Sequence, residues 1–284
     1  MNIYVVIPVH NEQDTIGLTL ESIINQSQPP QKLVVVADNC TDNTVEIVSK
    51  YTAQYNWTTA LDVKSSNEHL PGRKVINAFN QGFESLDDNF DIICKFDADI
   101  ILPLNYFERI RSIFRDDNSI GMASGLLYIE RNKEWVYENI ASKDHVRGPI
   151  KAYRKKCFKD IGGLRSAIGW DTIDVLLALK TNWKIQTDES LKVKHLKVTG
   201  KAYDRQSKLI SGERWYNMRY GFPLTLIASL KSAVQAKNFS LFMNSMRGYF
   251  KAKRMNKTPE VSIEEGKFIR KIRWQNMRKK YLKF

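Results

Sequence analysis

The chain has 284 residues, of which 43% are hydrophobic, and this is enough to bury a sizeable core. A predominantly disordered chain is therefore excluded, and one large domain or a domain with an appendage is expected. The formal net charge of +13 is uneven, because residues 1–100 carry −8 and residues 201–284 carry +15. A polyanionic partner, such as nucleic acid or an anionic membrane, would therefore be bound by the last third.

Alternating strands and helices are predicted for the first hundred residues. Compact β-rich runs occur at residues 3–8, 32–37, 60–64 and 91–96. Helical patterns lie between them at residues 16–24, 44–55 and 74–85, and a loop is predicted at residues 65–71. Apolar strands separated by helices indicate an α/β fold with a mainly parallel sheet and helices on both faces. In such sheets, ligands bind at the carboxyl ends of the strands.

The remainder of the chain is mixed and then helical. We expect helices at residues 104–114 and 172–179, with a strand at residues 120–129 between them. The last eighty residues have an amphipathic helical pattern in which Lys and Arg alternate with aromatic residues and Met. The longest uncharged apolar stretch, residues 220–230, is about half of the roughly 20 residues that a membrane-spanning helix needs. No spanning helix is expected.

The cellular compartment is indicated by the cysteines and by the N-terminus. Three cysteines lie far apart without CxxC spacing, which fits a reduced cytosolic protein better than a disulfide scaffold or a zinc ribbon. The opening MNIYVVIPVHNE lacks the basic region and long apolar run of a signal peptide. We therefore expect a cytoplasmic protein.

Two carboxylates follow the strand predicted at residues 91–96. Asp97 and Asp99 are two positions apart, so in extended geometry they face the same side and can converge on one hard divalent cation. Such a cation would bridge a diphosphate and neutralise charge on a leaving phosphate. The alternative is a pair of solvated loop acids, because short DxD patterns are common by chance.

Polar side chains also follow the first two predicted strands. Asn11 and Glu12 come after the first strand, and Asp38 ends the second. Acidic tips on neighbouring strands would explain the negative charge of the first third as a site. Turn formation or helix capping is the alternative for Asp38, and a place in the first turn of a helix is the alternative for Glu12.

Four motifs together resemble family 2 glycosyltransferases of the GT-A fold: IPVHNEQDTI, VVVADNCTDNT, FDAD and GWDTID, in the family's order over roughly residues 1–200. The resemblance implies a Rossmann-like, mainly parallel sheet flanked by helices. It predicts a glycosyltransferase domain at residues 1–215, with a nucleotide-sugar half at about 1–100 and an acceptor half at about 101–215. A helical, basic extension would follow at residues 216–284.

The resemblance also implies a nucleotide-diphosphate sugar as donor and Mn²⁺ or Mg²⁺ as cofactor. It assigns nucleotide contacts to four residues, which are Pro8, Asn11, Glu12 and Asp38. Asp97 would lie near the ribose or the metal, and Asp99 would be the main metal ligand.

Basic residues are implied near the diphosphate. Arg73 and Lys74, at the start of a predicted helix, resemble the family's Gly/Lys-rich segment and are equal candidates for diphosphate contact. A solvent-facing Arg-Lys pair is the alternative. His195 stands where some GT-A enzymes supply a further metal ligand, although a lone histidine among lysines is more often exposed.

The acceptor half resembles the family at GWDTID, where a Glu-Asp pair usually begins a helix and one acid is the general base. Trp170 replaces the glutamate, so Asp171 is the predicted base, and Asp174, one helical turn later, is the alternate. An inverting transfer needs one carboxylate to take the proton of the acceptor hydroxyl. Asp171 can also cap the helix.

The predicted activity is the transfer of a single sugar. The family's processive synthases carry a QxxRW signature, whereas residues 211–215 read SGERW, with serine in place of glutamine. We therefore expect a non-processive, inverting enzyme that acts on a hydroxyl of a glycan or lipid-linked acceptor in cell-surface polysaccharide biosynthesis. A sugar-nucleotide pyrophosphorylase is the enzymatic alternative, although IPVHNEQDTI lacks its Gly-rich phosphate loop.

The basic tail suggests where the enzyme works. Residues 239–250 interleave aromatic residues and Met between Lys-rich stretches, a pattern typical of a helix at the surface of an anionic membrane. We expect peripheral contact at the cytoplasmic face of the inner membrane. An ordinary helical subdomain and a non-catalytic basic binding module are the alternatives, and nucleic acid is disfavoured because no recognised motif accompanies the charge.

Overall fold

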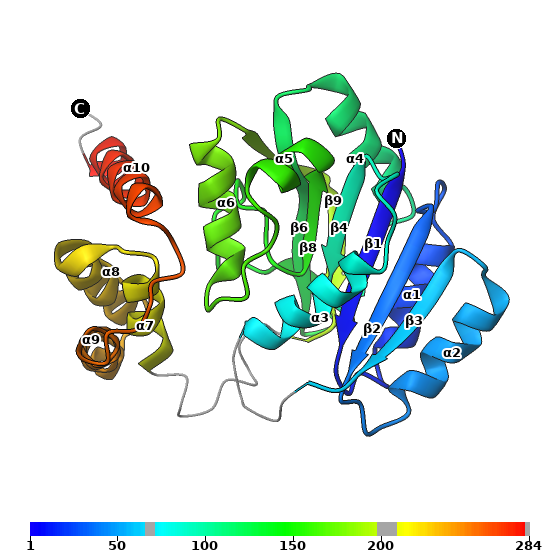
Figure 1. Ribbon diagram of the computed structural model, residues 1–284, viewed down its shortest axis with the longest axis horizontal. Helices are drawn as coiled ribbons and strands as arrows, with labels where there is room; N and C mark the ends of the chain where they lie inside the picture. Colours follow the sequence, from blue (N-terminus) through cyan, green and yellow to red (C-terminus); the bar gives the residue numbers. More distant parts are fainter. Residues whose placement is uncertain (66–71, 198–208, 282–284) are drawn as a thin grey trace. The chain divides into compact units, whose positions relative to one another are not determined.

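The computed structural model describes residues 1–65, 72–197 and 209–281 (Figure 1). They form two compact units. Unit 1 consists of Met1–Ser166 and Thr181–Val198, and unit 2 of Ala167–Lys180 and Thr199–Phe284. The division at residue 215 that the sequence suggested stays a prediction.

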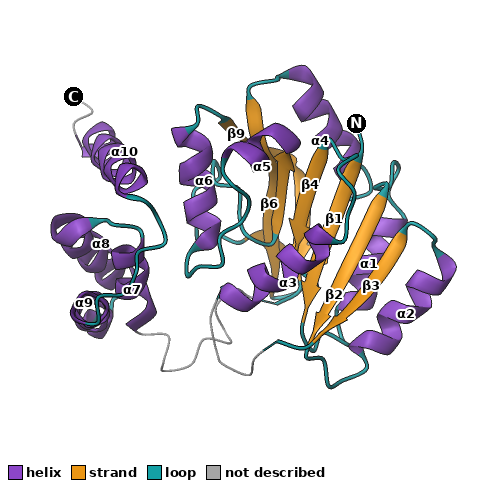
Figure 2. Cartoon of the chain, in the orientation of Figure 1, coloured by secondary structure: helices purple, strands orange, loops and turns teal. Residues whose placement is uncertain are grey.

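The first half of the sheet in unit 1 is parallel (Figure 2). Its order is β3-β2-β1-β4, and every neighbouring pair is parallel. The strands are β1 (Ile3–Val9), β2 (Lys32–Asp38), β3 (Thr58–Val63) and β4 (Ile92–Phe96). All residues of β1 and β4 are buried, as expected for strands that helices cover on both faces. The carboxyl ends of these strands consequently meet at one edge.

The second half of the sheet is mixed. It continues as β8-β6-β9-β5, in which β8 is antiparallel to β4 and β6, and β9 is parallel to β6. The elements are β5 (Ile100–Ile101), β6 (Ile120–Arg131), β8 (Ile150–Arg154) and β9 (Lys184–His195), and β7 (Glu134–Tyr137) pairs with β6. The expected α/β class is confirmed, with parallel pairing concentrated in the first half.

Helices cover both faces of this sheet. On one face, α1 (Ile16–Ile24), α2 (Thr44–Gln54) and α4 (Tyr106–Asp116) contribute to the main core. On the other face, α3 (Arg73–Glu84) lies close to the strands, because a Cβ at Gly82 would meet Val6 and Val36 side chains at 2.6 Å. The Phe79 and Phe158 rings connect α3 to α5 (Lys155–Asp160).

Unit 2 is helical in its described residues. It contains α6 (Trp170–Lys180), α7 (Ile210–Asn217), α8 (Gly221–Gln235), α9 (Phe239–Arg254) and α10 (Ile263–Tyr281). Glycines allow α9 to approach α7, since a Cβ at Gly212 would meet the Ser245 carbonyl at 1.7 Å and one at Gly248 the Leu209 carbonyl at 2.0 Å. Across the described part of the chain, no helix has both the length and the apolar run needed to cross a membrane.

Candidate active site

The polar segments after β1 and β2 lie against each other. His10 Nδ1 is 2.6 Å from the Asp38 carbonyl oxygen, and the Thr41 amide donates to Asn11 Oδ1 at 2.8 Å. Asn11 and Asn39 both have a φ of 52°, a left-handed conformation that asparagine tolerates better than most residues. These turns bring the predicted nucleotide contacts of the two strands to the same edge, next to Pro8, which is buried in β1.

Asp38 is held by the chain that follows β3. Its carboxylate accepts hydrogen bonds from the Ser65 amide at 3.2 Å and from the Ser65 hydroxyl at 3.0 Å. The turn at the start of α2 is instead bonded by Asp42, whose Oδ1 accepts from the Thr44 amide at 3.0 Å. Asp42 therefore forms the turn before α2, and Asp38 takes no part in it. Asp38 lies at the edge of the sheet where a nucleotide is predicted to bind.

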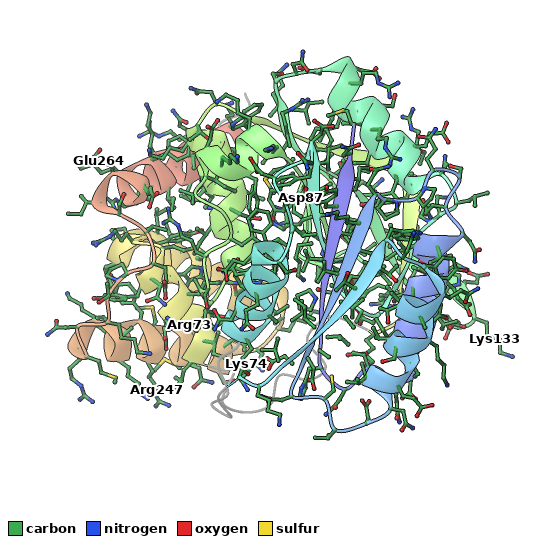
Figure 3. The ribbon with its side chains drawn as sticks, turned by 45° about the vertical axis from the view of Figure 1, so that its right-hand side comes forward. Arg73, Lys74, Asp87, Lys133, Arg247 and Glu264 are labelled. Carbon is green, nitrogen blue, oxygen red and sulfur yellow. The ribbon has the colours of Figure 1, made fainter. Side chains whose placement is uncertain are left out.

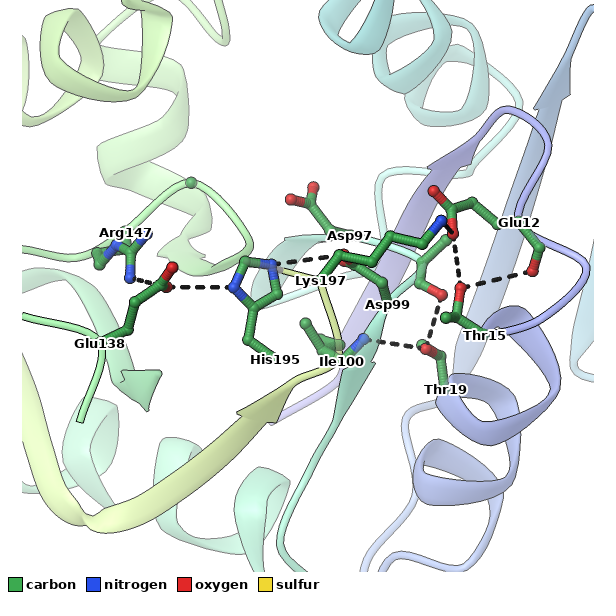
Figure 4. Close-up of polar contacts among 12 residues, drawn as sticks. Glu12, Thr15, Thr19, Asp97, Asp99, Ile100, Glu138, Arg147, His195 and Lys197 are labelled. Atoms are coloured by element: carbon green, nitrogen blue, oxygen red, sulfur yellow. Dashed lines mark hydrogen bonds and ion pairs between the residues drawn. The ribbon is translucent and has the colours of Figure 1, made fainter. Parts of the chain in front are cut away.

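The turn carrying Asp97 and Asp99 is fixed by α1 (Figure 4). The Thr19 hydroxyl donates to the Ala98 carbonyl at 2.9 Å and accepts from the Ile100 amide at 3.1 Å. Because Thr19 is fully buried, these bonds are shielded from water. The turn is thus rigid, as a site that positions carboxylates requires.

Asp97 is paired with a lysine of β4, the strand that it follows. Lys95 is 1% exposed, and its ammonium contacts Asp97 Oδ1 and the Gly148 carbonyl. A buried ammonium is costly without an anion, so Asp97 neutralises Lys95. Its predicted role near the ribose or the metal stays a prediction.

Asp99 faces a buried chain of charged side chains (Figure 4). His195 Nε2 lies 3.5 Å from Asp99 Oδ2, and His195 Nδ1 lies 3.2 Å from Glu138 Oε2. Glu138 in turn pairs with the Arg147 guanidinium. His195 is 5% exposed, so the alternative of an exposed histidine is wrong.

The charge state of His195 follows from these contacts. Burial alone would lower its pKa, but the hydrogen bonds to Asp99 and Glu138 outweigh burial and raise the pKa to about 9. At neutral pH the imidazolium therefore joins the two carboxylates, and His195 would have to release the proton on Nε2 in order to bind a metal. Glu138, which the sequence did not single out, fixes the orientation of the ring.

The donor atoms at this position fit a metal ion completed by a ligand. In the described ranges, no group of three His, Cys, Asp or Glu side chains could enclose a metal by itself. Asp99 and His195 nevertheless supply one oxygen and one nitrogen 3.5 Å apart, of kinds that Mn²⁺ accepts. Mg²⁺ is commonly held by one or two carboxylates together with substrate phosphates and water. The pair suits a cation whose remaining ligands come from a diphosphate.

Glu12, which follows β1, contacts the residue before α1 and the segment after β9. Its Oε2 accepts from the Thr15 hydroxyl at 2.6 Å and pairs with the ammonium of Lys197, which follows β9. Glu12 precedes α1, whose first turn contains no acidic residue, so the alternative of a place in that first turn is wrong. Its side chain instead connects the segments that follow β1 and β9. Lys197 was missed, because nothing distinguishes it from its neighbouring lysines in the sequence.

The two basic candidates for the diphosphate begin α3 (Figure 3). Arg73 and Lys74 follow Gly72, whose φ of 75° turns the chain into the helix. The Arg73 carbonyl accepts from the Ser166 hydroxyl at 3.3 Å, and both side chains are half-buried. The two side chains are therefore not fully exposed to solvent, in contrast to the alternative. Their contact with a diphosphate stays a prediction.

The two candidate bases lie in α6 of unit 2. Asp171 is in its first turn and half-buried, whereas Asp174 is only 2% exposed. Gly169, with a φ of 81°, precedes the helix, and a Cβ there would meet Arg214 Cδ at 2.5 Å. A cation therefore lies beside the start of α6, while Trp215 is buried as helix packing predicts.

Comparison with known proteins identifies the family. The profile of "Glycosyl transferase family 2" matches residues 4–165. The chain belongs to this family. The probable glycosyltransferase YdaM of Bacillus subtilis is 35% identical over 206 residues, covering 64% of this chain and 45% of that protein. Poly-beta-1,6-N-acetyl-D-glucosamine synthase of Staphylococcus epidermidis is 20% identical over 195 residues, covering 62% and 43%. The chain spans about half the length of these relatives.

Solved structures confirm the GT-A fold. The mannosyltransferase PcManGT from Pyrobaculum calidifontis, in complex with GDP-Man and Mn²⁺, aligns with a TM-score of 0.58 at 15% identity, covering 99% of this chain and 81% of that one. Residues 1–349 of TarS from S. aureus, in complex with UDP-GlcNAc, align with a TM-score of 0.57 at 18% identity, covering 93% and 77%. At these identities the likeness concerns the fold alone.

Proposed function

We propose that this chain is a metal-dependent, inverting glycosyltransferase that moves one sugar from a nucleotide-diphosphate sugar to a hydroxyl group. The observation that carries the proposal is the Asp99–His195 pair at the carboxyl edge of a GT-A sheet, beside the turns of Asn11 and Asp38. Membership of glycosyltransferase family 2 supports the reaction class.

The donor would lie along the edge formed by β1, β2 and β4. Asn11 and Asp38 would contact the base and ribose, since both are held by hydrogen bonds at neighbouring strand ends. Glu12 would support the same edge through Thr15 and Lys197. Arg73 and Lys74 would meet the diphosphate at the start of α3, where amide dipoles also favour negative charge. Complexes of fold relatives with GDP-Man and UDP-GlcNAc support a nucleotide sugar as donor.

A divalent cation would be held by Asp99 and His195. When bound, Mn²⁺ or Mg²⁺ supplies positive charge to the diphosphate leaving group. Glu138 would keep His195 Nε2 aimed at this position through its contact with Nδ1. Asp97, paired with Lys95, would keep a carboxylate near the ribose.

Asp171 would be the general base that takes the proton of the acceptor hydroxyl as its oxygen attacks the anomeric carbon. Its half-buried carboxylate is more accessible than that of Asp174, which supports Asp171 over the alternate. Inversion follows because the oxygen attacks opposite the departing diphosphate.

The acceptor would be a glycan or lipid-linked hydroxyl used in cell-surface polysaccharide synthesis, at the cytoplasmic face of a membrane. The poly-beta-1,6-N-acetyl-D-glucosamine synthase relatives support this substrate class. Single transfer, rather than processive synthesis, is favoured by serine at position 211 in the SGERW segment.

The test is a turnover assay with UDP-, GDP-, dTDP- and CMP-sugars, each with Mn²⁺, Mg²⁺ or EDTA. We expect metal-dependent release of nucleoside diphosphate from at least one donor. Release of pyrophosphate from a nucleoside triphosphate would instead identify a pyrophosphorylase, and an absence of binding and turnover with every donor would contradict the proposal.

A further inference from the structure

The solvent-facing side of α8 is apolar. Leu226, Leu230 and Val234 are 37%, 51% and 68% exposed, and Phe222 and Ile227 are exposed to similar degrees. Four of these side chains recur every four residues, so they form a stripe along one side of the helix. The opposite side, with Leu224, is buried. A helix in contact with water alone normally presents polar residues outward.

The stripe continues onto α9. The Phe222 ring contacts the Phe250 ring, with 6.0 Å between their centroids, and Phe250 is exposed. Met243 and Phe239 are exposed on the same side of α9, about two and three helical turns before Phe250. The exposed apolar side chains of both helices thus form one surface, here called the α8–α9 face.

The charges on α8 and α9 have one sign. Residues 221–254, which span these two helices, contain six Lys and Arg residues and no Asp or Glu. Lys231, Lys237, Arg247 and Lys251 belong to this segment and are exposed, and Arg247 extends from α9 in Figure 3. An apolar face bordered by cations is complementary to a surface that is apolar within and anionic outside.

We propose that the α8–α9 face docks on an anionic lipid bilayer, with its apolar side chains among the acyl chains and its cations at the headgroups. A second copy of the chain is disfavoured, because pairing two such faces would bring cations against cations. The proposal stands apart from catalysis and does not depend on the proposed function. It extends the expected membrane contact from residues 239–250 to α8. The sequence alone did not show which side of α8 faces solvent.

Co-sedimentation with vesicles tests the proposal. The intact chain should bind vesicles of phosphatidylcholine with one quarter phosphatidylglycerol, bind pure phosphatidylcholine vesicles far less, and lose affinity as salt is raised. Leu226→Glu with Leu230→Glu should reduce the binding constant for anionic vesicles at least about tenfold, because two carboxylates would enter the interface. Failure of the intact chain to bind anionic vesicles at low salt would overturn the proposal.

The matched control is Leu18→Glu with Leu104→Glu. These leucines of unit 1 are 46% and 66% exposed, so this variant makes the same substitutions and the same charge change away from the face. It should bind vesicles like the unaltered chain. Equal losses in both variants would show that net charge alone drives binding and would overturn the proposal.

A second variant covers the case in which the first fails to fold. Arg247→Glu with Lys251→Glu alters exposed cations only and should remove the preference for anionic vesicles. Sedimentation velocity of the unaltered chain tests whether a second copy of the chain, rather than a membrane, covers the α8–α9 face. A dimer that Leu226→Glu with Leu230→Glu dissociates would assign the face to self-association and overturn membrane docking.

Discussion

The carboxyl edge of the sheet in unit 1 and the α8–α9 face of unit 2 differ in how their charged side chains are arranged. At the edge, charged groups are paired, as in the contacts of buried Lys95 with half-buried Asp97 and of buried His195 with Asp99 and Glu138. On α8 and α9, cations are exposed in a segment without carboxylates, beside exposed apolar side chains. Fixed, paired groups suit a small ligand whose atoms need defined positions, whereas a broad apolar and cationic surface suits an extended partner.

The largest effect should come from Asp99→Asn at the edge. Loss of this carboxylate should lower sugar transfer at least about 10³-fold, because the cation at the leaving diphosphate loses its main ligand. Steady-state kinetics with Mn²⁺ measure the effect. Asp87→Asn is the matched control, since Asp87 is an exposed carboxylate that pairs with Lys32. Equal activity of both variants would remove Asp99 from the site.

Asp171→Asn should separate chemistry from binding. We expect kcat to fall by about 10²–10³ while the KM of the donor is unchanged, because a general base acts only in the transfer step. Asp174→Asn, at the buried alternate position, should affect stability more than kcat. If Asp174→Asn alone abolished transfer in a folded protein, the assignment of the two residues would be reversed.

Glu138→Gln should weaken metal binding through His195. The expected loss of Mn²⁺ affinity is about 10- to 100-fold, because the amide no longer fixes the ring as a carboxylate does. Titration of Mn²⁺ followed by electron paramagnetic resonance measures it without turnover. Glu134→Gln, an exposed glutamate of β7, serves as the control and should leave the affinity unchanged. A fall in thermal stability without a change in Mn²⁺ affinity would limit Glu138 to a structural role.

The smallest effects concern how closely the helices of each unit pack. Gly248→Ala should destabilise the protein by about 1–3 kcal/mol, because its Cβ would collide with the Leu209 carbonyl. Gly17→Ala in α1 has only ordinary contacts at 3.8 Å and should stabilise by about 0.5–1 kcal/mol. Urea denaturation compares the two. The same sign for both variants would contradict the close approach of α7 and α9.

Much of the fold was predictable because its strands are buried and continuous. The run at residues 91–96 became β4 (Ile92–Phe96), and the run at residues 3–8 became β1 (Ile3–Val9). The two-residue β5 and the partly exposed β7 were not predicted, because neither has a periodic apolar pattern. Pairing that switches to antiparallel at β8 depends on tertiary contacts, which no local pattern encodes.

The site was predictable where a motif follows a strand, and less so where distant segments meet. Asp99 follows β4, but its contact with His195 joins positions that are far apart in the sequence. Glu138 lies in the segment YEN after β7, where nothing marks it as buried or as a partner of His195. The solvent-facing side of α8 could not be predicted either, because YGFPLTLIASL is apolar on nearly every side of a helix.

In the proposed site, the Asp99–His195 pair holds the divalent cation that accompanies the nucleotide sugar. A crystal structure of the chain with Mn²⁺ and a nucleoside diphosphate, with anomalous data collected for manganese, would show whether these two residues bind the metal. We expect an anomalous peak about 2.0–2.3 Å from both Asp99 Oδ2 and His195 Nε2, with the diphosphate completing the coordination. A manganese peak with neither residue as ligand, or a nucleotide bound away from the edge of β1, β2 and β4, would contradict it.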